Sequence, residues 1–150
     1  MEDRYLFKAK RIDNGEWVCG SYVYTFCEDK NGIVVGVKVV KHWIAEESGN
    51  MVWVDESTIC QCTGLKDKNG KKIWENDIVL VKSDYPRVKK GVVEYHAPKY
   101  ILKMSDYSYN HDLISKEEVN TGREHYYINY KYEVIGNIFD NPELLESEAK

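Results

Sequence analysis

The chain has 150 residues, of which 43% are hydrophobic and 31% are charged, and its formal net charge is −4. This size and composition suit a globular protein of one domain, or of two small subdomains that share a core, and exclude a largely disordered chain. No apolar run is long enough to span a membrane, no signal peptide is indicated at the start, and the acidic balance argues against a general polyanion binder. We therefore expect a cytoplasmic protein without a membrane partner.

The chain begins with a predicted β-hairpin. Residues 5–12 alternate as the two faces of a strand do, and Asp13-Asn14-Gly15 then predicts a turn. Residues 16–26 form the returning strand. We expect a bend or bulge at Gly20, because an isolated glycine within a strand often marks one.

Further strands are predicted in the rest of the first half. The tetrapeptide Asp29-Lys30-Asn31-Gly32 predicts a turn, and the β-branched residues at 33–40 predict a strand. Residues 41–50 predict a loop or a short helix, and residues 51–54 begin another strand. No segment of this half shows a sustained period of 3.6 residues, so we expect little helix.

The four cysteines, Cys19, Cys27, Cys60 and Cys62, all lie in the first half of the chain. A reducing compartment argues against disulfides, and Cys60-Gln61-Cys62 lacks the spacing of a zinc knuckle. The four thiols could still converge on one zinc ion, but a free cysteine is more often a small buried apolar residue. We therefore expect no metal and no cofactor.

The stretch from Thr63 to Val79 is the most informative part of the sequence. Asp67-Lys68-Asn69-Gly70 predicts a reverse turn, because Asn and Gly accept a positive φ and an Asp side chain can bond to the backbone that follows. Glu75-Asn76-Asp77 predicts a second turn, and the run 78–81 reads as a buried strand. The residues expected to build this structural motif are Thr63, Gly64, Leu65, Asp67, Asn69, Gly70, Trp74, Glu75 and Asp77.

A polar loop at 82–90 and a strand at 91–95 follow. Together with the preceding strand they form a pattern similar to the small five-stranded barrels of the Src-homology-3 type, a likeness at the level of the fold that carries no function. Residues 100–104 predict a strand, and residues 112–119 predict one or two helical turns.

The end of the chain is predicted to return to the sheet. Residues 124–138 form a long strand region that is broken at Gly136. A terminal helical turn is expected after Asn141, with Pro142 at its first position.

The motif at 63–79 resembles the signature of the YopX family, a group of small proteins encoded by bacteriophages and prophages, mostly of Gram-positive bacteria. Phe7-Lys8-Ala9 with the turn that follows and Trp17 is similar to the opening of the family, and residues 133–145 are similar to its ending. Asn76 stands where the family is expected to have glycine, and asparagine is the next best residue for a left-handed turn position. The resemblance covers nearly the whole chain. It implies an all-β fold and a phage context, and it implies no activity.

We predict an all-β fold with minor helix. Residues 1–62 form an N-terminal meander of hairpins, which packs on a small barrel-like unit at residues 63–150. This second unit carries an insertion near residues 96–123.

Catalysis has weak support in the sequence. Asp77 beside Glu75 could act as a base or a ligand, but a turn role is sufficient to explain Asp77. Cys60 or Cys62 could be a nucleophile, which would need a lowered thiol pKa and a close base. The candidate bases are the histidines His42, His96, His111 and His125. No phosphate-binding loop and no His-Glu-x-x-His motif occurs, so we expect a protein that is not an enzyme.

The stretch from Lys82 to Lys103 is the sequence candidate for binding single-stranded nucleic acid. Six basic residues stand against the acidic Asp84 and Glu94, and tyrosines are interleaved with them. Basic residues contact phosphates and aromatic rings stack on bases. The candidate residues are Lys82, Arg87, Lys89, Lys90, Lys99, Lys103, Tyr85, Tyr95 and Tyr100. The alternative is a solvated loop that protects an edge strand, and the acidic whole chain does not favour nucleic acid.

Tyrosines crowd the last third of the chain and are the candidate interface. They are Tyr107, Tyr109, Tyr126, Tyr127, Tyr130 and Tyr132. Tyrosine is favoured in protein interfaces, although a tyrosine-rich core explains the pattern equally well. We expect a non-enzymatic binding or assembly module of the host bacterial cytoplasm, encoded by a phage or prophage, that forms a homo-oligomer or binds another protein. A single-stranded nucleic-acid-binding protein and a small phage enzyme are the alternatives.

Overall fold

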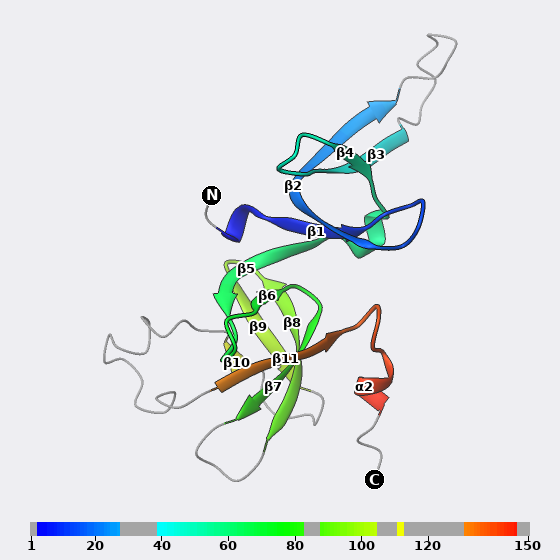
Figure 1. The fold of residues 1–150 in the computed structure, drawn as a ribbon. Helices are drawn as coiled ribbons and strands as arrows, with labels where there is room; N and C mark the ends of the chain where they lie inside the picture. The colour runs from blue at the N-terminus through cyan, green and yellow to red at the C-terminus, as the bar shows by residue number, and fades with distance from the viewer. Residues whose placement is uncertain (1–2, 28–38, 83–87, 105–110, 113–130, 147–150) are drawn as a thin grey trace. The chain divides into compact units, whose positions relative to one another are not determined.

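The computed structural model describes residues 3–27, 39–82, 88–104, 111–112 and 131–146, which are coloured in Figure 1. Their secondary structure consists of antiparallel strands and a few short helical turns, so the predicted all-β fold is confirmed. The chain divides into two compact units, Met1–Gln61 and Cys62–Lys150. Within the described residues, no helix has the length and apolar character needed to cross a membrane.

The first unit is an antiparallel sheet with two single turns of 3-10 helix. Its elements are η1 (Asp3–Tyr5), β1 (Phe7–Lys10), β2 (Trp17–Cys27), β3 (Val39–Ala45), β4 (Met51–Trp53), η2 (Glu56–Thr58) and the first residues of β5 (Cys60–Lys66). The strands pair in the order β4-β3-β2-β1-β5. A single bridge between Arg11 and Val54 also joins the chain after β1 to the chain after β4.

The core of the first unit follows from strand alternation. Its buried side chains are Ala9, Val18, Ile44, Val52 and Val54. Ile44 of β3 lies directly opposite Val52 of β4, and both face this core. Because successive strand residues point to opposite faces, the neighbours of these two residues are placed on the outer face.

Gly20 lies where β2 changes partners. Phe7 of β1 pairs with Gly20, whereas the pairing with β3 begins at Ser21 opposite Ala45. A Cβ atom at Gly20 would lie 2.1 Å from the carbonyl oxygen of Ala45. Of the expected bend or bulge, the pairing shows no bulge at this position, and close approach of two backbones explains the glycine.

The prediction of a loop or short helix at 41–50 is wrong for its first half. Val39–Ala45 is the strand β3, which pairs with β2 on one side and β4 on the other. Only the residues after Ala45 form a turn, closed by a hydrogen bond of 2.9 Å from the Glu46 N–H to the Asn50 carbonyl oxygen. Pairing on both sides decides the conformation of this segment, and local propensity does not reveal it.

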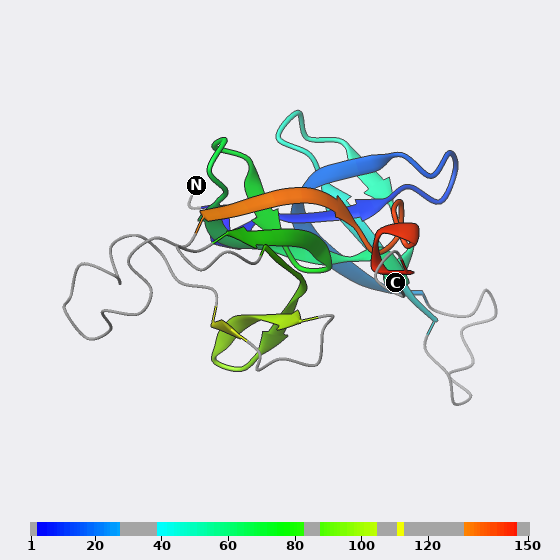
Figure 2. The same ribbon diagram turned by 90° about the horizontal axis from the view of Figure 1, so that it is seen from below.

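The second unit contains a five-stranded antiparallel sheet and a short hairpin. Its elements are the rest of β5, β6 (Lys72–Trp74), β7 (Asp77–Lys82), β8 (Lys89–His96), β9 (Lys99–Met104), β10 (His111–Asp112), β11 (Lys131–Asn137) and α2 (Glu143–Glu146). The sheet has the order β10-β9-β8-β7-β11, and β5 pairs with β6. Figure 2 shows β11 beside β7, with α2 after the turn that follows β11. These described strands form an open sheet, so the predicted closed barrel is not found.

One face of this sheet carries the core of the second unit. The buried residues are Ile73, Val79, Val81, Val93, Leu102, Met104 and Tyr132. The β11 strand shifts register between Val134 and Gly136, which agrees with the expected break at Gly136. Within the range 96–123, where we expected an insertion, the strand predicted at 100–104 is found as β9, which pairs with β8 on one side and β10 on the other.

Candidate functional site

Asp67 organises the turn of the central motif. Its Oδ1 accepts hydrogen bonds from the Asn69 and Lys71 N–H groups at 2.9 Å each, and its Oδ2 accepts one from the Val134 N–H at 3.1 Å. Burial raises the pKa of the Asp67 carboxyl, but the backbone hydrogen bonds from Val134, Lys71 and Asn69 outweigh it and leave the pKa below its ordinary value. A buried carboxylate with these donors joins the β5–β6 hairpin to β11.

The residues before this turn also bond to the backbone. The Thr63 hydroxyl donates to the Ile73 carbonyl oxygen at 2.8 Å and accepts from the Leu65 N–H at 3.1 Å. Gly64 and Gly70 both have φ of 81°, a conformation that favours glycine. Leu65 packs against the core of the second unit.

Asp77 and its neighbours close the turn between β6 and β7. The Asp77 side chain is buried, and its Oδ2 accepts the Trp74 N–H at 2.8 Å. Asn76 has φ of 65°, the left-handed conformation that the sequence predicts for it. Its N–H donates to the Val93 carbonyl oxygen at 2.8 Å, and Glu75 beside it is half-buried. This geometry gives Asp77 a structural role in the turn.

The cysteine and histidine candidates lie in separate environments. Cys60 and Cys62 are buried, and their thiols donate to the carbonyl oxygens of Thr58 at 3.3 Å and Ile73 at 3.8 Å. His96 is exposed and lies 3.0 Å from Glu94. In the part of the chain that the structure describes, no three His, Cys, Asp or Glu side chains are arranged to hold a metal ion. The His111 side chain and His125 lie outside the described residues.

His42 belongs to a polar cluster beside the first core. Its Nδ1 lies 2.6 Å from the Tyr22 hydroxyl, and its Nε2 lies 3.3 Å from the Glu56 carboxylate. The rings of Tyr22 and His42 stack, with an interplanar angle of 8°. Burial, with smaller contributions from Glu56 and Tyr24, raises the pKa of Tyr22 above its ordinary value.

The basic residues and tyrosines of 82–103 divide between the two faces of the second sheet. Tyr95 and Tyr100 pair across β8 and β9 on the same face as the core pair Val93 and Leu102. Strand alternation places the remaining described lysines, except Lys89, on the opposite face. These lysines are Lys82, Lys90, Lys99 and Lys103. The described residues therefore do not form the common basic and aromatic surface that the sequence suggested.

Several of the basic residues and tyrosines of 82–103 also make contacts within the second unit. Lys90 is buried, and its Nζ donates to the Leu144 carbonyl oxygen after β11. Lys103 lies 3.6 Å from the Glu94 carboxylate. Burial and then the charge of Glu75 raise the pKa of Tyr100 to about 12. Tyr85 and Arg87 lie outside the described residues.

Of the tyrosines proposed as an interface, the structure describes Tyr132. It is 9% exposed and belongs to the core of the second unit, so it does not lie on a free surface. The remaining candidates lie outside the described residues; they are Tyr107, Tyr109, Tyr126, Tyr127 and Tyr130.

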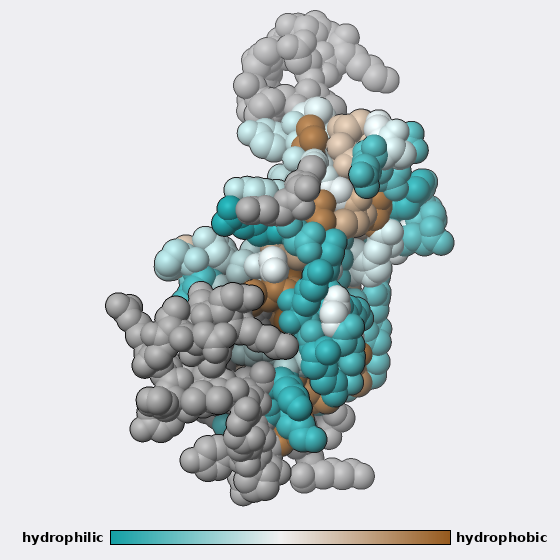
Figure 3. All heavy atoms as spheres, turned by 60° about the vertical axis from the view of Figure 1, so that its left-hand side comes forward, coloured by the Kyte–Doolittle hydropathy of each residue, from teal (hydrophilic) through white to brown (hydrophobic). Residues whose placement is uncertain are grey.

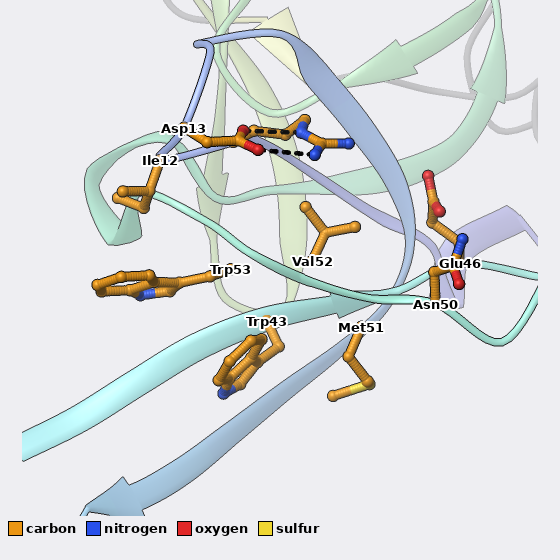
Figure 4. Close-up of a pocket in the computed structure, with 9 residues that line it drawn as sticks. Ile12, Asp13, Trp43, Glu46, Asn50, Met51, Val52 and Trp53 are labelled. Atoms are coloured by element: carbon orange, nitrogen blue, oxygen red, sulfur yellow. Dashed lines mark hydrogen bonds and ion pairs between the residues drawn. The ribbon is translucent and has the colours of Figure 1, made fainter.

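Apolar side chains reach the surface in the first unit, beside hydrophilic ones (Figure 3). A groove of about 530 Å³ lies on this unit, and its lining is drawn in Figure 4. We call it the tryptophan groove. It is lined by Arg11, Ile12, Asp13, Trp43, Glu46, Asn50, Met51, Val52 and Trp53. All of these residues come from the β1–β2 turn, β3, the turn after β3 and β4.

The strand register explains why the two tryptophans meet. Trp43 of β3 lies directly opposite Trp53 of β4, so both rings stand on the outer face of the sheet. Met51 lies on the same face, opposite Ala45. Ile12 joins them because its N–H donates to the Trp53 carbonyl oxygen at 3.1 Å.

The apolar side chains of this groove remain open to solvent. Ile12 is 49% exposed, Met51 is 48% exposed and Trp53 is 45% exposed. The rings are nevertheless held in place: the Trp43 Nε1–H donates to the Thr25 hydroxyl at 2.9 Å, and the Lys41 Nζ lies 4.7 Å from the centroid of the Trp53 ring. The groove thus offers a preorganised apolar surface.

The two ends of the groove differ in chemistry. Figure 4 shows Ile12, Trp43 and Trp53 at one end, and Glu46 with Asn50 at the other. At the rim, the Arg11 guanidinium donates to both oxygens of Asp13, at 2.9 and 2.8 Å.

The ion pair at the rim sets the charge state of its two members. The hydrogen bond from Arg11 lowers the pKa of Asp13 below its ordinary value. The bond and charge of Asp13, with smaller contributions from Glu46 and Glu16, raise the pKa of Arg11. Both groups are therefore charged at neutral pH.

This groove was not predicted from the sequence. One signal for it exists in Met51-Val52-Trp53-Val54, where both faces of a strand are apolar. Val52 and Val54 fill the core, which leaves Met51 and Trp53 without a place in it. A strand that is apolar on both faces but covered on one indicates a surface for a partner.

Comparison with known proteins gives a family match and a similar solved structure. The family model described as YopX protein matches residues 7–146. A crystal structure of protein EF1440 from Enterococcus faecalis is similar to this chain, with 24% sequence identity, coverage of 93% of this chain and 96% of that chain, and a TM-score of 0.44. Among curated proteins, none matches the chain.

Proposed function

The chain belongs to the YopX family, and on that premise we propose that it is a non-enzymatic binding protein whose tryptophan groove receives a segment of another protein. One observation carries the proposal. Three half-exposed apolar side chains, Ile12, Met51 and Trp53, gather around a single groove within the first unit. Contiguous exposed apolar side chains with a polar rim are typical of protein-binding sites.

The chemistry of the groove suits protein recognition. Tryptophan is enriched among the residues that dominate binding energy, because it buries a large area with few rotatable bonds. Trp43 and Trp53 are already restrained by Thr25 and Lys41, so little side-chain entropy remains to be lost on binding. The polar rim can satisfy the hydrogen bonds of a partner backbone.

The placement of the tyrosines and lysines in the second unit favours a protein partner over nucleic acid. Tyr95 and Tyr100 lie on the face opposite Lys82, Lys90 and Lys103, so one strand of nucleic acid would not contact both groups at once. The phage or prophage context and a location in the host bacterial cytoplasm belong to the proposal through the family. The partner of the groove could be a second copy of the same chain.

A random-peptide display library tests the groove without knowledge of the partner. We expect the wild-type protein to enrich peptides, and Trp53→Ala to weaken their binding about tenfold or more, as removal of a central anchor does. The matched control is Tyr24→Ala. Tyr24 is 55% exposed on the other face of the same sheet, so its removal should leave peptide binding unchanged.

Two outcomes contradict the proposal. In the first, the library yields no peptide that binds the wild-type protein. In the second, the enriched peptides bind the folded Trp53→Ala variant as tightly as the wild type, which would place their site elsewhere.

A further inference from the structure

We propose that the segment received by the tryptophan groove is a basic, proline-rich stretch in the polyproline II conformation, with a Lys or Arg three residues from an apolar residue. This inference rests on the proposed function and adds the chemical class of the partner. Its support is the charge at one end of the groove, the aromatic surface at the other end, and the spacing between them.

The polar end of the groove carries an excess of negative charge. Arg11 and Asp13 neutralise each other through their paired hydrogen bonds. The Glu46 carboxylate accepts a hydrogen bond of 3.5 Å from the Ser48 hydroxyl, and no ion pair is found for it among the residues that the structure describes. Glu46 lines the groove, so its carboxylate adds a negative charge that the Arg11–Asp13 pair does not offset.

The aromatic end favours an apolar group that is flat or branched. Proline rings and aliphatic side chains pack well on tryptophan faces, which is how aromatic-lined grooves receive polyproline II segments. A tryptophan ring also attracts cations, but Lys41 of this chain already lies over the Trp53 ring and takes that position. A partner cation is therefore expected at the Glu46 end.

The distance between the two ends sets the spacing in the partner. Glu46 lies beside Asn50 through its backbone hydrogen bond of 2.9 Å, and Trp53 is three residues further along the extended chain. At about 3.3 Å per residue the separation is on the order of 10 Å. A polyproline II helix has about three residues per turn and rises about 3.1 Å per residue, so positions i and i+3 share a face at about 9 Å.

Binding of three synthetic peptides, measured by fluorescence anisotropy with a labelled peptide, tests the inference. The first has Arg three residues from Leu in a proline-rich frame. The second has the same composition with Arg directly beside Leu, and the third has Glu in place of Arg. We expect the first peptide to bind at least about tenfold more tightly than the third, with an affinity that falls as salt rises. The second should bind more weakly than the first.

Variants assign the effect to the groove. Glu46→Gln keeps the shape of the side chain and removes its charge, so we expect it to weaken the first peptide roughly three- to tenfold. Glu143→Gln, at an exposed glutamate of the second unit, is the matched control and should have no effect. Ile12→Ser removes an exposed turn side chain, and it serves as the groove variant if Trp53→Ala does not fold.

The outcomes separate this inference from the proposed function. If the Arg and Glu peptides bind equally and both are weakened by Ile12→Ser, the basic partner is wrong and the groove remains a binding site. If both arrangements of Arg and Leu bind equally, the polyproline II spacing is wrong. If none of the three peptides binds, or if none is weakened by a folded groove variant, the basic polyproline II partner is wrong, and the peptide library decides whether the groove receives another kind of segment.

Discussion

At the scale of single residues, Asp67 shows how one carboxylate fixes a turn. Its two oxygens accept hydrogen bonds from the N–H groups of Asn69, Lys71 and Val134. In Asp67→Asn, one oxygen becomes an NH2 group, which faces the Val134 N–H donor or displaces the other bonds. Because this leaves a buried donor without an acceptor, we expect the free energy of unfolding at neutral pH to fall by about 1–3 kcal/mol.

The loss of stability caused by Asp67→Asn should depend on pH. The folded state holds the pKa of Asp67 below its ordinary value, so the ionised carboxylate contributes stability above about pH 4. This contribution is lost as the pH falls through the pKa of Asp67 in the folded state. The difference in the free energy of unfolding between the wild type and Asp67→Asn should therefore narrow in that pH range. Thermal unfolding followed by circular dichroism across this range measures it. Glu133→Gln, at a surface ion pair with Lys68, is the control and should change stability by less than about 1 kcal/mol.

Asn76 gives a second prediction at this scale, since its φ of 65° is unfavourable for most residues. Asn76→Gly should keep or slightly increase stability, because glycine adopts this conformation without strain. Asn76→Ala should decrease the free energy of unfolding by about 1–2 kcal/mol, the usual cost of the left-handed conformation. Urea unfolding of both variants measures whether Asn76→Gly is more stable than Asn76→Ala. Equal stabilities would contradict the claim that the left-handed backbone at this position selects the residue.

At the scale of elements, Lys90 of β8 connects the second sheet to α2. Its Nζ donates to the Leu144 carbonyl oxygen, and a helix of this length has no stability by itself. We expect Lys90→Met to increase amide hydrogen exchange at residues 143–146 and to leave β8 protected. Lys103→Met, at an exposed lysine on the same face of the sheet, is the control and should leave α2 unchanged. Faster exchange in β8 itself would mean that the lysine supports the sheet instead.

The elements differ in how far the sequence predicts them. The turns at Asp67–Gly70 and Asn76 follow from local rules, because positive φ values select glycine and asparagine. The segment Lys41–Ala45 does not, since it becomes a strand through pairing with β2 and β4. The prediction of a closed barrel was wrong for a similar reason, because a strand pattern indicates a sheet but does not determine whether the sheet closes.

At the scale of the whole molecule, the 63–79 motif and the tryptophan groove lie in different units. The 63–79 motif builds a turn and a strand of the second unit, whereas the groove belongs to the first unit. The groove could not be predicted in full because Ile12 and Trp53 meet only through the fold, by the bond from the Ile12 N–H to the Trp53 carbonyl oxygen. Its apolar residues were visible in the sequence, but their place on the surface depends on which face of β4 the core covers.

Solution NMR of the indole N–H signals measures whether the tryptophan groove receives a partner segment. The chain has four tryptophans, and two of them, Trp17 and Trp74, lie outside the groove and serve as internal controls. On titration with a peptide enriched by the wild-type protein, we predict saturable shifts of the Trp43 and Trp53 signals, while the other two stay in place. Unchanged Trp43 and Trp53 signals at saturating peptide, or shifts confined to Trp17 and Trp74, would contradict the claim.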